Sequence, residues 1–518
     1  MDILNTIIIL FSTPLILLLL TFSFLTLRIF SGKSLNNPEY PPVRGTAFSL
    51  LIHINDSYDY LTTIAAKDST FRILLPSPKS FIYTTEPRNI EHVLKTSFNK
   101  YSKGENSREI MADLFGKGIL LSDGEEWRHQ KKLASFEFST RVLRDFSCCV
   151  FRRNAAKLVR VVSGFEGRVF DMQALLMKCT LDSIFEVGFG VELNCLDSEG
   201  SSSEEAAQFS KAFDALNALV YRRFVDPIWK LKRFLHISSE ACLRKEAKVV
   251  DDFVKKLIVT KRKLLALKGD LNNGKEDILS RFLMESEKDP EKMNDKYLRD
   301  VVLNFMIAGK DTSAGTLSWF FYMLCKHPLV QEKVEQEIRD VFSGKLDGVA
   351  NISNIDDLIE NISDATLEKM HYLHATLTET LRLYPAVPVD GRCADVEDIL
   401  SNGFKVKKGD EVFYAAYAMG RMPYIWGEDA EEFRPERWLN NGVFQPESPF
   451  KFVAFHAGPR ICLGKDFAYR QMKIISIALV YFFRFKLADE TRNLTYKTSL
   501  TLHIAGELPL CAILRKIL

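Results

Sequence analysis

The sequence predicts a mainly α-helical protein that carries a small, mostly antiparallel β-sheet and begins with a transmembrane helix. Over residues 296–326, apolar side chains recur at three- and four-residue spacing, which is the pattern of a buried helix. Strand-like runs are few, short and separated by helical segments. Residues 3–27 contain no charged side chain, which is typical of a membrane-spanning helix.

The long central helix is expected to end at Lys326, before the His327-Pro328 step, because the residue before a proline disfavours the helical conformation. Helix is expected to restart at Pro328, since proline is favoured at the first helical position. The strand-like runs are residues 71–75, 80–83, 412–416 and 498–504. Because these runs lie far apart in the chain, we expect one small sheet assembled from distant segments.

The N-terminal apolar run is long enough to cross a membrane. A helix over residues 3–27 would extend roughly 37 Å, and a hydrocarbon core is about 30 Å thick. A cleaved signal peptide is the alternative, but it usually has a basic start and a small-residue cleavage site. Here Asp2 precedes the run and the bulky Phe30 follows it. We therefore expect residues 1–30 to be a retained anchor.

The residues after the anchor predict its orientation and the division of the chain. Arg28 and Lys33 follow the apolar run, and this positive charge predicts that the downstream chain lies in the cytosol. Residues 31–45 contain three prolines, which resist helix formation, so this segment is expected to be a stiff, Pro-rich hinge. No internal repeat follows, and residues 46–518 are predicted to form one domain.

The composition limits the classes of function. The chain has 518 residues, 47% apolar and 26% charged, with a formal net charge of +2, so nothing favours a nucleic-acid partner. Nine cysteines without disulfide or zinc-site spacing favour a reducing compartment. No Gly-x-Gly-x-x-Gly motif follows a strand-like run, so no dinucleotide site is predicted. Electrons from a nicotinamide cofactor would have to come from another protein.

The most specific segment surrounds one cysteine. Residues 455–464 read FHAGPRICLG and resemble the haem-binding loop of the cytochrome P450 superfamily, Phe-x-x-Gly-x-Arg-x-Cys-x-Gly, at every specified position. The resemblance implies that haem b is the cofactor and that the Cys462 thiolate binds its iron, with Phe455 and Gly458 in the same loop. Iron and backbone amides must hold the thiolate charged, because free cysteine has a pKa of about 8.5. Arg460 suits a haem propionate, since its planar guanidinium donates paired hydrogen bonds.

Two further strings resemble the structural core of this superfamily. Glu379 and Arg382, in ETLR, lie three residues apart and therefore on the same side of a helix. The later string FRPERW contains Arg437, which the resemblance assigns as the third member of a Glu-Arg-Arg network. In the family this network holds the core around the haem and does not react.

The string AGKDTS lies inside the long central helix. One interpretation is a buried helix that happens to contain Gly309, at a cost of about 1 kcal/mol. The resemblance implies an oxygen-activation site instead, in which the glycine permits the helix to open locally over the iron. Thr312 would donate a hydrogen bond to the bound dioxygen, and Asp311 would supply protons to that site.

Two shorter similarities imply further contacts to the propionates. Trp127 and Lys131, in WRHQKK, resemble the helix that contacts these groups, although the family more often has arginine where this chain has Lys131. Arg392, in PVDGRCA, occupies the place of another propionate-binding arginine.

The resemblance covers essentially the whole chain and implies a monooxygenase. Such an enzyme inserts one oxygen atom of O2 into a C–H bond of an apolar substrate, with electrons from NADPH–cytochrome P450 reductase. Together with the predicted anchor, it implies a single-pass protein of the endoplasmic reticulum membrane whose catalytic domain faces the cytosol. The strings LFGKGILLSDGEEWRHQKKLASFEFS and FVDPIWKLKRFL resemble the plant branch that hydroxylates long-chain fatty acids, often at or near the omega end. By analogy with the family, residues 301–307, 387–390 and 499–502 line the substrate pocket.

Three alternatives stay open. A monooxygenase of the same superfamily that acts on terpenoids or sterols differs in pocket shape. A haem-thiolate isomerase or dehydratase uses a peroxide already present in its substrate and needs neither reductase nor oxygen activation, and the Asp311-Thr312 pair argues against it. A haem-binding protein without turnover would lack some of the proton-delivery or network residues, and this chain has them.

Overall fold

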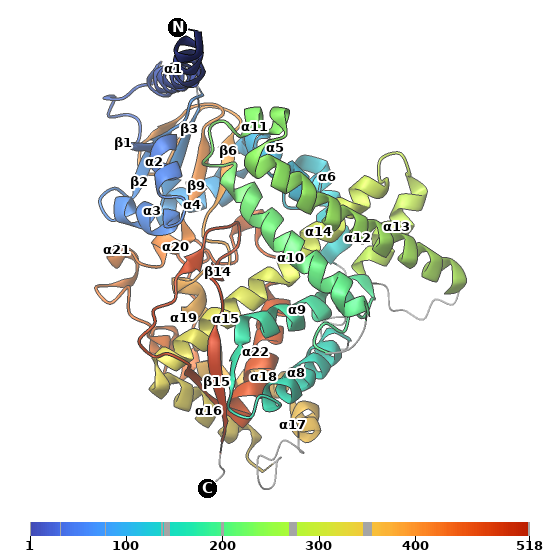
Figure 1. Ribbon diagram of the computed structural model, residues 1–518. Coiled ribbons are helices and arrows are strands. Elements are labelled where there is room, and N and C mark those ends of the chain that lie inside the picture. Colours follow the sequence, from blue (N-terminus) through green and yellow to red (C-terminus); the bar gives the residue numbers. More distant parts are fainter. Residues whose placement is uncertain are drawn as a thin grey trace.

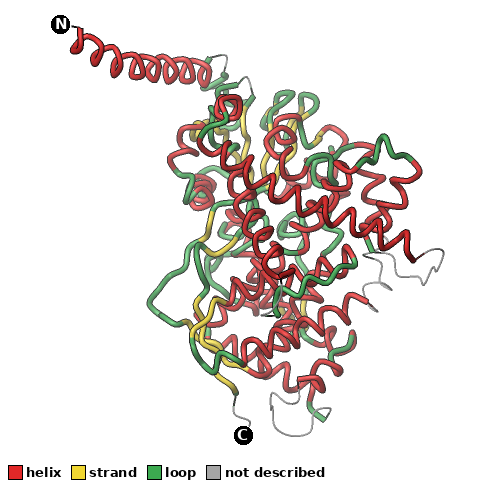
Figure 2. Tube along the Cα trace, turned by 45° about the vertical axis from the view of Figure 1, so that its right-hand side comes forward, coloured by secondary structure: helices red, strands yellow, loops and turns green. Residues whose placement is uncertain are grey.

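Helices make up most of the molecule, and its largest sheet lies at the end that carries the N-terminal helix (Figure 1). The computed structural model describes residues 2–31, 33–77, 79–135, 138, 146–197, 201–268, 277–344 and 355–515. The N-terminal helix stands out from the body, and the C-terminus lies at the opposite end of the molecule (Figure 2). The predicted mainly α-helical fold is confirmed.

Most helices of the described body share one large apolar core, and smaller apolar clusters lie beside it. They are α1 (Asp2–Phe30), α2 (Ala47–Ile52), α3 (Ser57–Ala65), α4 (Pro87–Glu91), α5 (Glu105–Phe115), α6 (Gly124–Ser135), α8 (Cys148–Ser163), α9 (Met172–Phe189), α10 (Ser201–Arg222), α11 (Trp229–Leu235), α12 (Ser238–Lys268), α13 (Ile278–Lys288), α14 (Asp295–Gly309), α15 (Asp311–Lys326), α16 (Pro328–Phe342), α17 (Ile355–Asn361), α18 (Asp364–Lys369), α19 (His371–Leu383), α20 (Ala416–Met419), α21 (Pro423–Trp426) and α22 (Lys465–Phe482). Helix α15 lies in the middle of the body, with α9, α19 and α22 packed around it (Figure 1).

The central apolar run forms two helices instead of the one that its periodicity predicts. Helix α14 ends at Gly309 and α15 begins at Asp311, with Lys310 between them. A Cβ atom at Gly309 would lie 2.5 Å from Ile184 of α9, so the glycine allows α9 to pack directly against the break. Thr180 of α9 also donates a hydrogen bond of 3.0 Å to the Lys310 carbonyl. The apolar periodicity continues through the break, so the sequence pattern does not predict that the helix is interrupted there.

Local sequence sets the outer ends of this helix pair. Asn294 caps α14, because its side chain accepts hydrogen bonds from the backbone amides of Lys296 and Tyr297. The predicted end of the run at Lys326 and the restart of helix at Pro328 are confirmed.

The largest sheet has six strands in the order β1-β2-β3-β9-β6-β4. Its strands are β1 (Val43–Thr46), β2 (Thr70–Leu74), β3 (Ser80–Thr84), β4 (Tyr101–Ser102), β6 (Asp390–Ala394) and β9 (Glu411–Tyr414). The pairs β1–β2 and β3–β9 are parallel, and the other pairs are antiparallel. Most of the described strand pairs are antiparallel, as predicted, but the structure corrects the expectation of one sheet, since the largest sheet is mixed and smaller antiparallel sheets accompany it. An alternating pattern predicts which side chains share a face but not which strand is the partner.

The smaller sheets come mainly from the C-terminal third of the chain. Their strands are β5 (Val169–Asp171), β7 (Asp398–Ile399), β8 (Lys405–Val406), β10 (Leu439–Asn440), β11 (Val443–Phe444), β12 (Phe483–Leu487), β13 (Tyr496–Lys497), β14 (His503–Ile504) and β15 (Pro509–Leu514). The predicted strand over residues 498–504 is wrong except for β14. Residues before β14 run as a loop because side chains bind their backbone: Tyr58 donates to the Ser499 carbonyl and Asn217 accepts from the Leu500 amide.

The predicted hinge makes specific contacts with the body. The buried Arg72 of β2 donates hydrogen bonds of 2.6 Å to the Pro41 carbonyl and 2.8 Å to the Ser34 carbonyl. The Lys405 amide donates to the Glu39 carbonyl at 2.7 Å. These bonds hold part of the segment against the sheet. The prolines that predicted a stiff hinge do not predict these contacts.

Helix α1 has 29 residues and includes the whole N-terminal apolar run, residues 3–27. Within the part of the chain that the structure describes, no helix has both the length and the apolar character needed to cross a membrane.

Candidate active site

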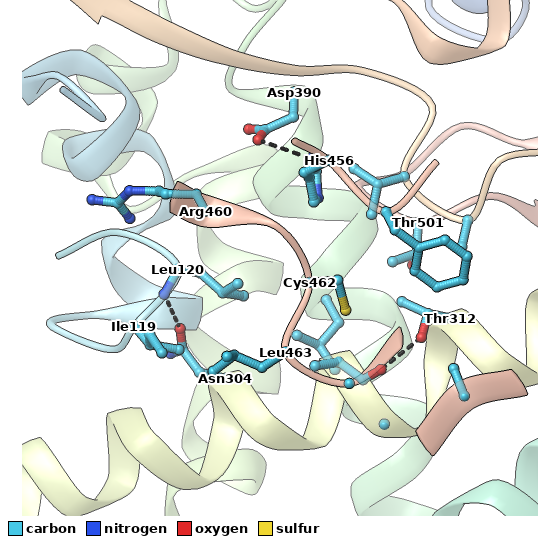
Figure 3. Close-up of a pocket in the computed structure, with 18 of the residues that line it drawn as sticks. Ile119, Leu120, Asn304, Thr312, Asp390, His456, Arg460, Cys462, Leu463 and Thr501 are labelled. Carbon is cyan, nitrogen blue, oxygen red and sulfur yellow. Dashed lines mark hydrogen bonds and ion pairs between the residues drawn. The ribbon is translucent and has the colours of Figure 1, made fainter. Parts of the chain in front are cut away.

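A cavity of about 290 Å³ lies between the cysteine loop and the α14–α15 pair (Figure 3). Its walls come from distant parts of the chain, including α6, α14, α15, β6 and the loop before α22. The predicted site residues that line it are Trp127, Lys131, Thr312, Arg392, Phe455, Arg460 and Cys462. The predicted site residues outside the lining are Asp311, Glu379, Arg382, Arg437 and Gly458. The fold therefore brings together in one cavity residues that are hundreds of positions apart.

Each predicted pocket segment contributes part of the wall. The lining includes Asn304, Phe305 and Ile307 from the first segment, Val387, Val389 and Asp390 from the second, and Leu500 and Thr501 from the third. Other members of the first segment, such as Val302 and Met306, are fully buried away from the cavity. Helical geometry separates them, because neighbouring residues on a helix face different sides.

Cys462 lies between a short 3₁₀ helix, Gly458–Arg460, and the start of α22. Its amide donates a hydrogen bond of 2.9 Å to the Phe455 carbonyl and so closes the loop. Burial raises the pKa of the Cys462 thiol, and a hydrogen bond from the Gly464 amide opposes this rise. A buried thiol that receives an amide hydrogen bond is suited to bind a metal ion as the thiolate.

Gly458 allows the cysteine loop to pass against a neighbouring segment. Its φ angle is +66°, and a Cβ atom there would lie 2.0 Å from the Leu94 carbonyl oxygen. Both the backbone conformation and the lack of space require glycine at this position.

One end of the cavity is basic. The lining that the structure describes has four lysine and arginine side chains, Lys103, Lys131, Arg392 and Arg460, and one carboxylate, Asp390. Burial and the nearby Arg392 lower the pKa of Lys103 to about 8, and the same two causes lower the pKa of Arg460 to about 10. The Nε atom of the buried Arg392 has no hydrogen-bond partner in the described structure. An anionic ligand at this end would stabilise the cations and satisfy that donor.

Trp127 packs against two of these cations. The guanidinium carbon of Arg460 lies 4.4 Å from the centroid of the indole ring, and the Lys131 Nζ lies 5.1 Å from it. Lys131 also donates a hydrogen bond of 2.6 Å to the Pro459 carbonyl. Arg460 donates a hydrogen bond of 2.6 Å to the Ser122 carbonyl. Helix α6 and the cysteine loop are thus joined at the basic end of the cavity.

The residues around the cavity fit haem. A haem presents an iron that binds a thiolate, two anionic propionates and an apolar macrocycle. The cavity presents a thiol, a basic end with an unsatisfied guanidinium donor, and mostly apolar side chains between them.

Thr312 faces the cavity, whereas Asp311 lies behind its wall. The Thr312 hydroxyl donates a hydrogen bond of 2.6 Å to the Ala308 carbonyl (Figure 3). The Asp311 side chain is fully buried, and its Oδ2 accepts hydrogen bonds from Asn217 at 3.2 Å and from Thr501 at 3.4 Å. Because Thr501 lines the cavity, it connects the buried carboxylate with that space.

A buried lysine connects Asp311 with the surface. The Lys310 Nζ lies 2.6 Å from the Asp214 carboxylate and 3.1 Å from that of Asp311. Although burial opposes it, these two carboxylates raise the pKa of Lys310 above its usual range, so the lysine stays protonated. The Asp214 side chain is 36% exposed, so the network reaches solvent. Sequence reasoning missed these partners: Lys310 adjoins Asp311 in the chain, but Asp214, Asn217 and Thr501 meet it only in the fold.

Glu379, Arg382 and Arg437 meet outside the cavity lining. Two guanidinium nitrogens of Arg382 donate to the Glu379 carboxylate at 2.7 and 2.8 Å. The Arg437 Nε lies 3.5 Å from the same carboxylate, and the Trp438 indole donates to it at 2.9 Å. The side chains of Glu379 and Arg382 are completely buried. The network joins α19 to the segment around Trp438.

Known proteins resemble this chain along most of its length. The family model described as "Cytochrome P450" matches residues 38–508. The chain is 50% identical over 470 residues to "Cytochrome P450 704C1" of Pinus taeda, with 90% of each chain covered. It is 43% identical over 500 residues to "Cytochrome P450 704B1" of Arabidopsis thaliana, covering 90% of this chain and 92% of the relative. It is 38% identical over 483 residues to "Cytochrome P450 86B1" of Arabidopsis thaliana, covering 91% and 85%.

Proteins of this family are monooxygenases that bind haem b through a cysteine thiolate and use O2, an apolar substrate and electrons from a redox partner. The predictions of cofactor and of enzyme class are thereby confirmed. From its sequence and its relatives, this chain belongs to the cytochrome P450 family.

Proposed function

We propose that this protein hydroxylates a long-chain fatty acid at or near its omega end. The observation that carries the proposal is the cavity, where Cys462 and Thr312 share a space whose other walls are mostly apolar. Figure 3 draws Cys462 with Ile119, Leu120 and Asn304 on one side and Thr312 and Thr501 on the other. An apolar chain fits such a wall, and the strings that resemble the plant fatty-acid branch support this substrate class.

Within this proposal, the Cys462 thiolate would hold the haem iron. Arg392, Arg460, Lys131 and Trp127 hold the propionates at the basic end of the cavity, together with Lys103. The free Nε of Arg392 supports this role, because a propionate oxygen would satisfy it. Phe455 and Gly458 shape the cysteine loop, and Glu379, Arg382 and Arg437 hold the surrounding fold. Bound haem supplies the iron at which O2 is reduced and cleaved.

The residues of α15 control protons in this mechanism. Thr312 presents a hydroxyl to the cavity, and Asp311 holds a carboxylate behind it. The protonated Lys310 keeps Asp311 connected to the partly exposed Asp214. Lys310 keeps its own proton and holds Asp311 in place, and protons pass between Asp311 and the cavity through the Thr501 hydroxyl, which donates to Asp311 Oδ2. An apolar wall limits other access of water to the substrate.

The proposal extends to location and partners. Residues 1–30 are a single-pass anchor in the endoplasmic reticulum membrane, residues 31–45 a hinge, and residues 46–518 the catalytic domain on the cytosolic side. Arg28 after the apolar run supports this orientation. The electron donor is NADPH–cytochrome P450 reductase, which docks on the Cys462 side, and a shared membrane raises the encounter rate.

A spectral titration tests the substrate class. We expect a saturable low-to-high spin shift when the purified ferric protein is titrated with a saturated or an unsaturated long-chain fatty acid, since the chain displaces water from the iron. A normal haem-thiolate spectrum without any shift would contradict the fatty-acid proposal and favour a terpenoid or a sterol. NADPH-independent turnover of a lipid hydroperoxide would favour the isomerase alternative.

Thr312→Ala is expected to uncouple NADPH consumption from product formation. The hydroxyl that delivers protons in the cavity is lost, and general acid–base groups contribute about 10²–10⁴-fold. The measurement is product formed per NADPH consumed. Ser318→Ala is the matched control, because Ser318 makes the same type of hydroxyl-to-carbonyl bond, to Ala314, away from the cavity. Wild-type coupling in Thr312→Ala would remove Thr312 from the mechanism.

A further inference from the structure

The segment 116–121, here called the strap, forms part of the cavity wall after α5. Its residues Ile119, Leu120 and Leu121 line the cavity. Figure 3 shows Ile119 and Leu120 beside Asn304 of α14. The strap contains no regular helix or strand, so its position depends on the contacts of its backbone.

Two side chains of α14, Asp300 and Asn304, hold the strap and are here called the clamp. They lie four residues apart and therefore on one face of the helix. The Lys117 amide donates to Asp300 Oδ2 at 2.9 Å, and the Leu120 amide donates to Asn304 Oδ1 at 3.0 Å. The Asn304 Nδ2 donates back to the Phe115 carbonyl, at the end of α5, at 2.9 Å. The clamp thus satisfies backbone groups before and within the strap.

The glycines of the strap let its backbone touch the clamp. A Cβ atom at Gly116 would lie 1.9 Å from Asp300 Oδ2, and one at Gly118 would lie 1.9 Å from Asn304 Nδ2. Gly116 also has a φ angle of +49°. No larger residue fits at either position without displacing the strap or the clamp.

Asn304 uses both of its hydrogen-bond donors within the protein although it lines the cavity. Its Nδ2 donates to the Phe115 carbonyl and, at 2.7 Å, to the Asp300 carbonyl, which uses both of its hydrogens. Its Oδ1 accepts from Leu120. Only 1% of each clamp residue is exposed. Asn304 therefore has no donor for a substrate and acts through the strap.

The clamp ties the strap to the helix that leads to the reacting centre. Helix α14 also presents Phe305 and Ala308 to the cavity, and Ala308 accepts the hydrogen bond of Thr312. We propose that Asp300 and Asn304 are positioning residues that determine which carbon of the substrate is oxidised, by holding the strap at a set place relative to α14. A flexible acyl chain presents the same carbon to the reacting centre only when the apolar wall beside it is rigid. That the substrate is a fatty acid rests on the proposed function.

Hydrogen–deuterium exchange tests the clamp without any substrate. In Asn304→Ala, we expect the peptide that covers residues 116–121 to exchange about tenfold faster than in the wild type, because bonds at Leu120 and Phe115 are lost. Lys117→Ala is the matched control, since it removes an exposed side chain from the strap and leaves its amide bound to Asp300. Unchanged exchange in Asn304→Ala would overturn the proposal.

The positions of product hydroxyl groups test the consequence. With a saturated long-chain fatty acid, the ratio of the main isomer to its neighbours should fall about fivefold or more in Asn304→Ala. Gly118→Ala should lower the same ratio, because the added Cβ atom would clash with the Asn304 side chain and displace the strap. This second variant adds volume where the first removes it, so a shared effect points to the strap and not to cavity size. Lys117→Ala should keep the wild-type isomers.

A double-mutant cycle completes the test. The effects of Asn304→Ala and Gly118→Ala on the isomer ratio should be less than additive, since the truncated side chain leaves room for the new Cβ. If Asn304→Ala does not retain haem, Asn304→Asp takes its place, because it keeps an acceptor for Leu120 and loses the donors. Faster exchange with unchanged isomers would overturn the proposal. A wild type that makes no hydroxylated fatty acid contradicts the substrate class alone, and the exchange experiment still decides whether the clamp holds the strap.

Discussion

Replacing Cys462 with alanine is expected to abolish the thiolate character of the bound haem completely. The sulfur lies in the wall of the cavity and accepts a hydrogen bond from the Gly464 amide, and alanine has no atom that could replace it. The ferrous–CO absorption spectrum measures this change, because its position depends on the thiolate ligand. Monooxygenase turnover should vanish with it.

Cys393→Ala is the matched control for this experiment. Cys393 is a buried cysteine in β6 next to Arg392, and it does not line the cavity. Its replacement should leave the haem-thiolate spectrum as in the wild type. A wild-type ferrous–CO spectrum in Cys462→Ala would end the assignment of Cys462 as the ligand.

Glu379→Ala is expected to destabilise the protein by about 3–5 kcal/mol, because it leaves the charge of Arg382 buried without its carboxylate partner. The Trp438 indole and the Arg434 amide lose the same acceptor. The free energy of unfolding, measured by denaturant titration of the haem-bound protein, gives the size of the effect. Since the network does not line the cavity, the ferrous–CO spectrum of the folded fraction should stay unchanged.

An exposed ion pair provides the control for Glu379→Ala. Lys333 and Glu436 lie 2.6 Å apart, with side chains that are 58% and 43% exposed. Lys333→Ala should therefore cost only about 0–1 kcal/mol. Equal stability of Glu379→Ala and the wild type would contradict a structural role for the network.

The break at Lys310 shows where sequence patterns stop being informative. The apolar run 296–326 and the proline after it predicted the outer ends of the α14–α15 pair, because caps and prolines act on residues next to them. The break depends on Ile184 and Thr180 of α9, which pack against it from another part of the chain. In the same way, the alternating runs predicted β2 and β3, but not that β3 pairs in parallel with β9.

By itself, the sequence determined the components whose geometry is local. The loop from Phe455 to the Cys462 amide closes over a few residues, and Glu379 and Arg382 lie one helical turn apart, so spacing alone was informative. Only the tertiary structure decided which distant groups meet: Asp311 with Thr501, and Asn304 with the strap. The physical reason is that a motif depends on neighbouring backbone geometry, whereas a contact between distant segments depends on how the whole core packs.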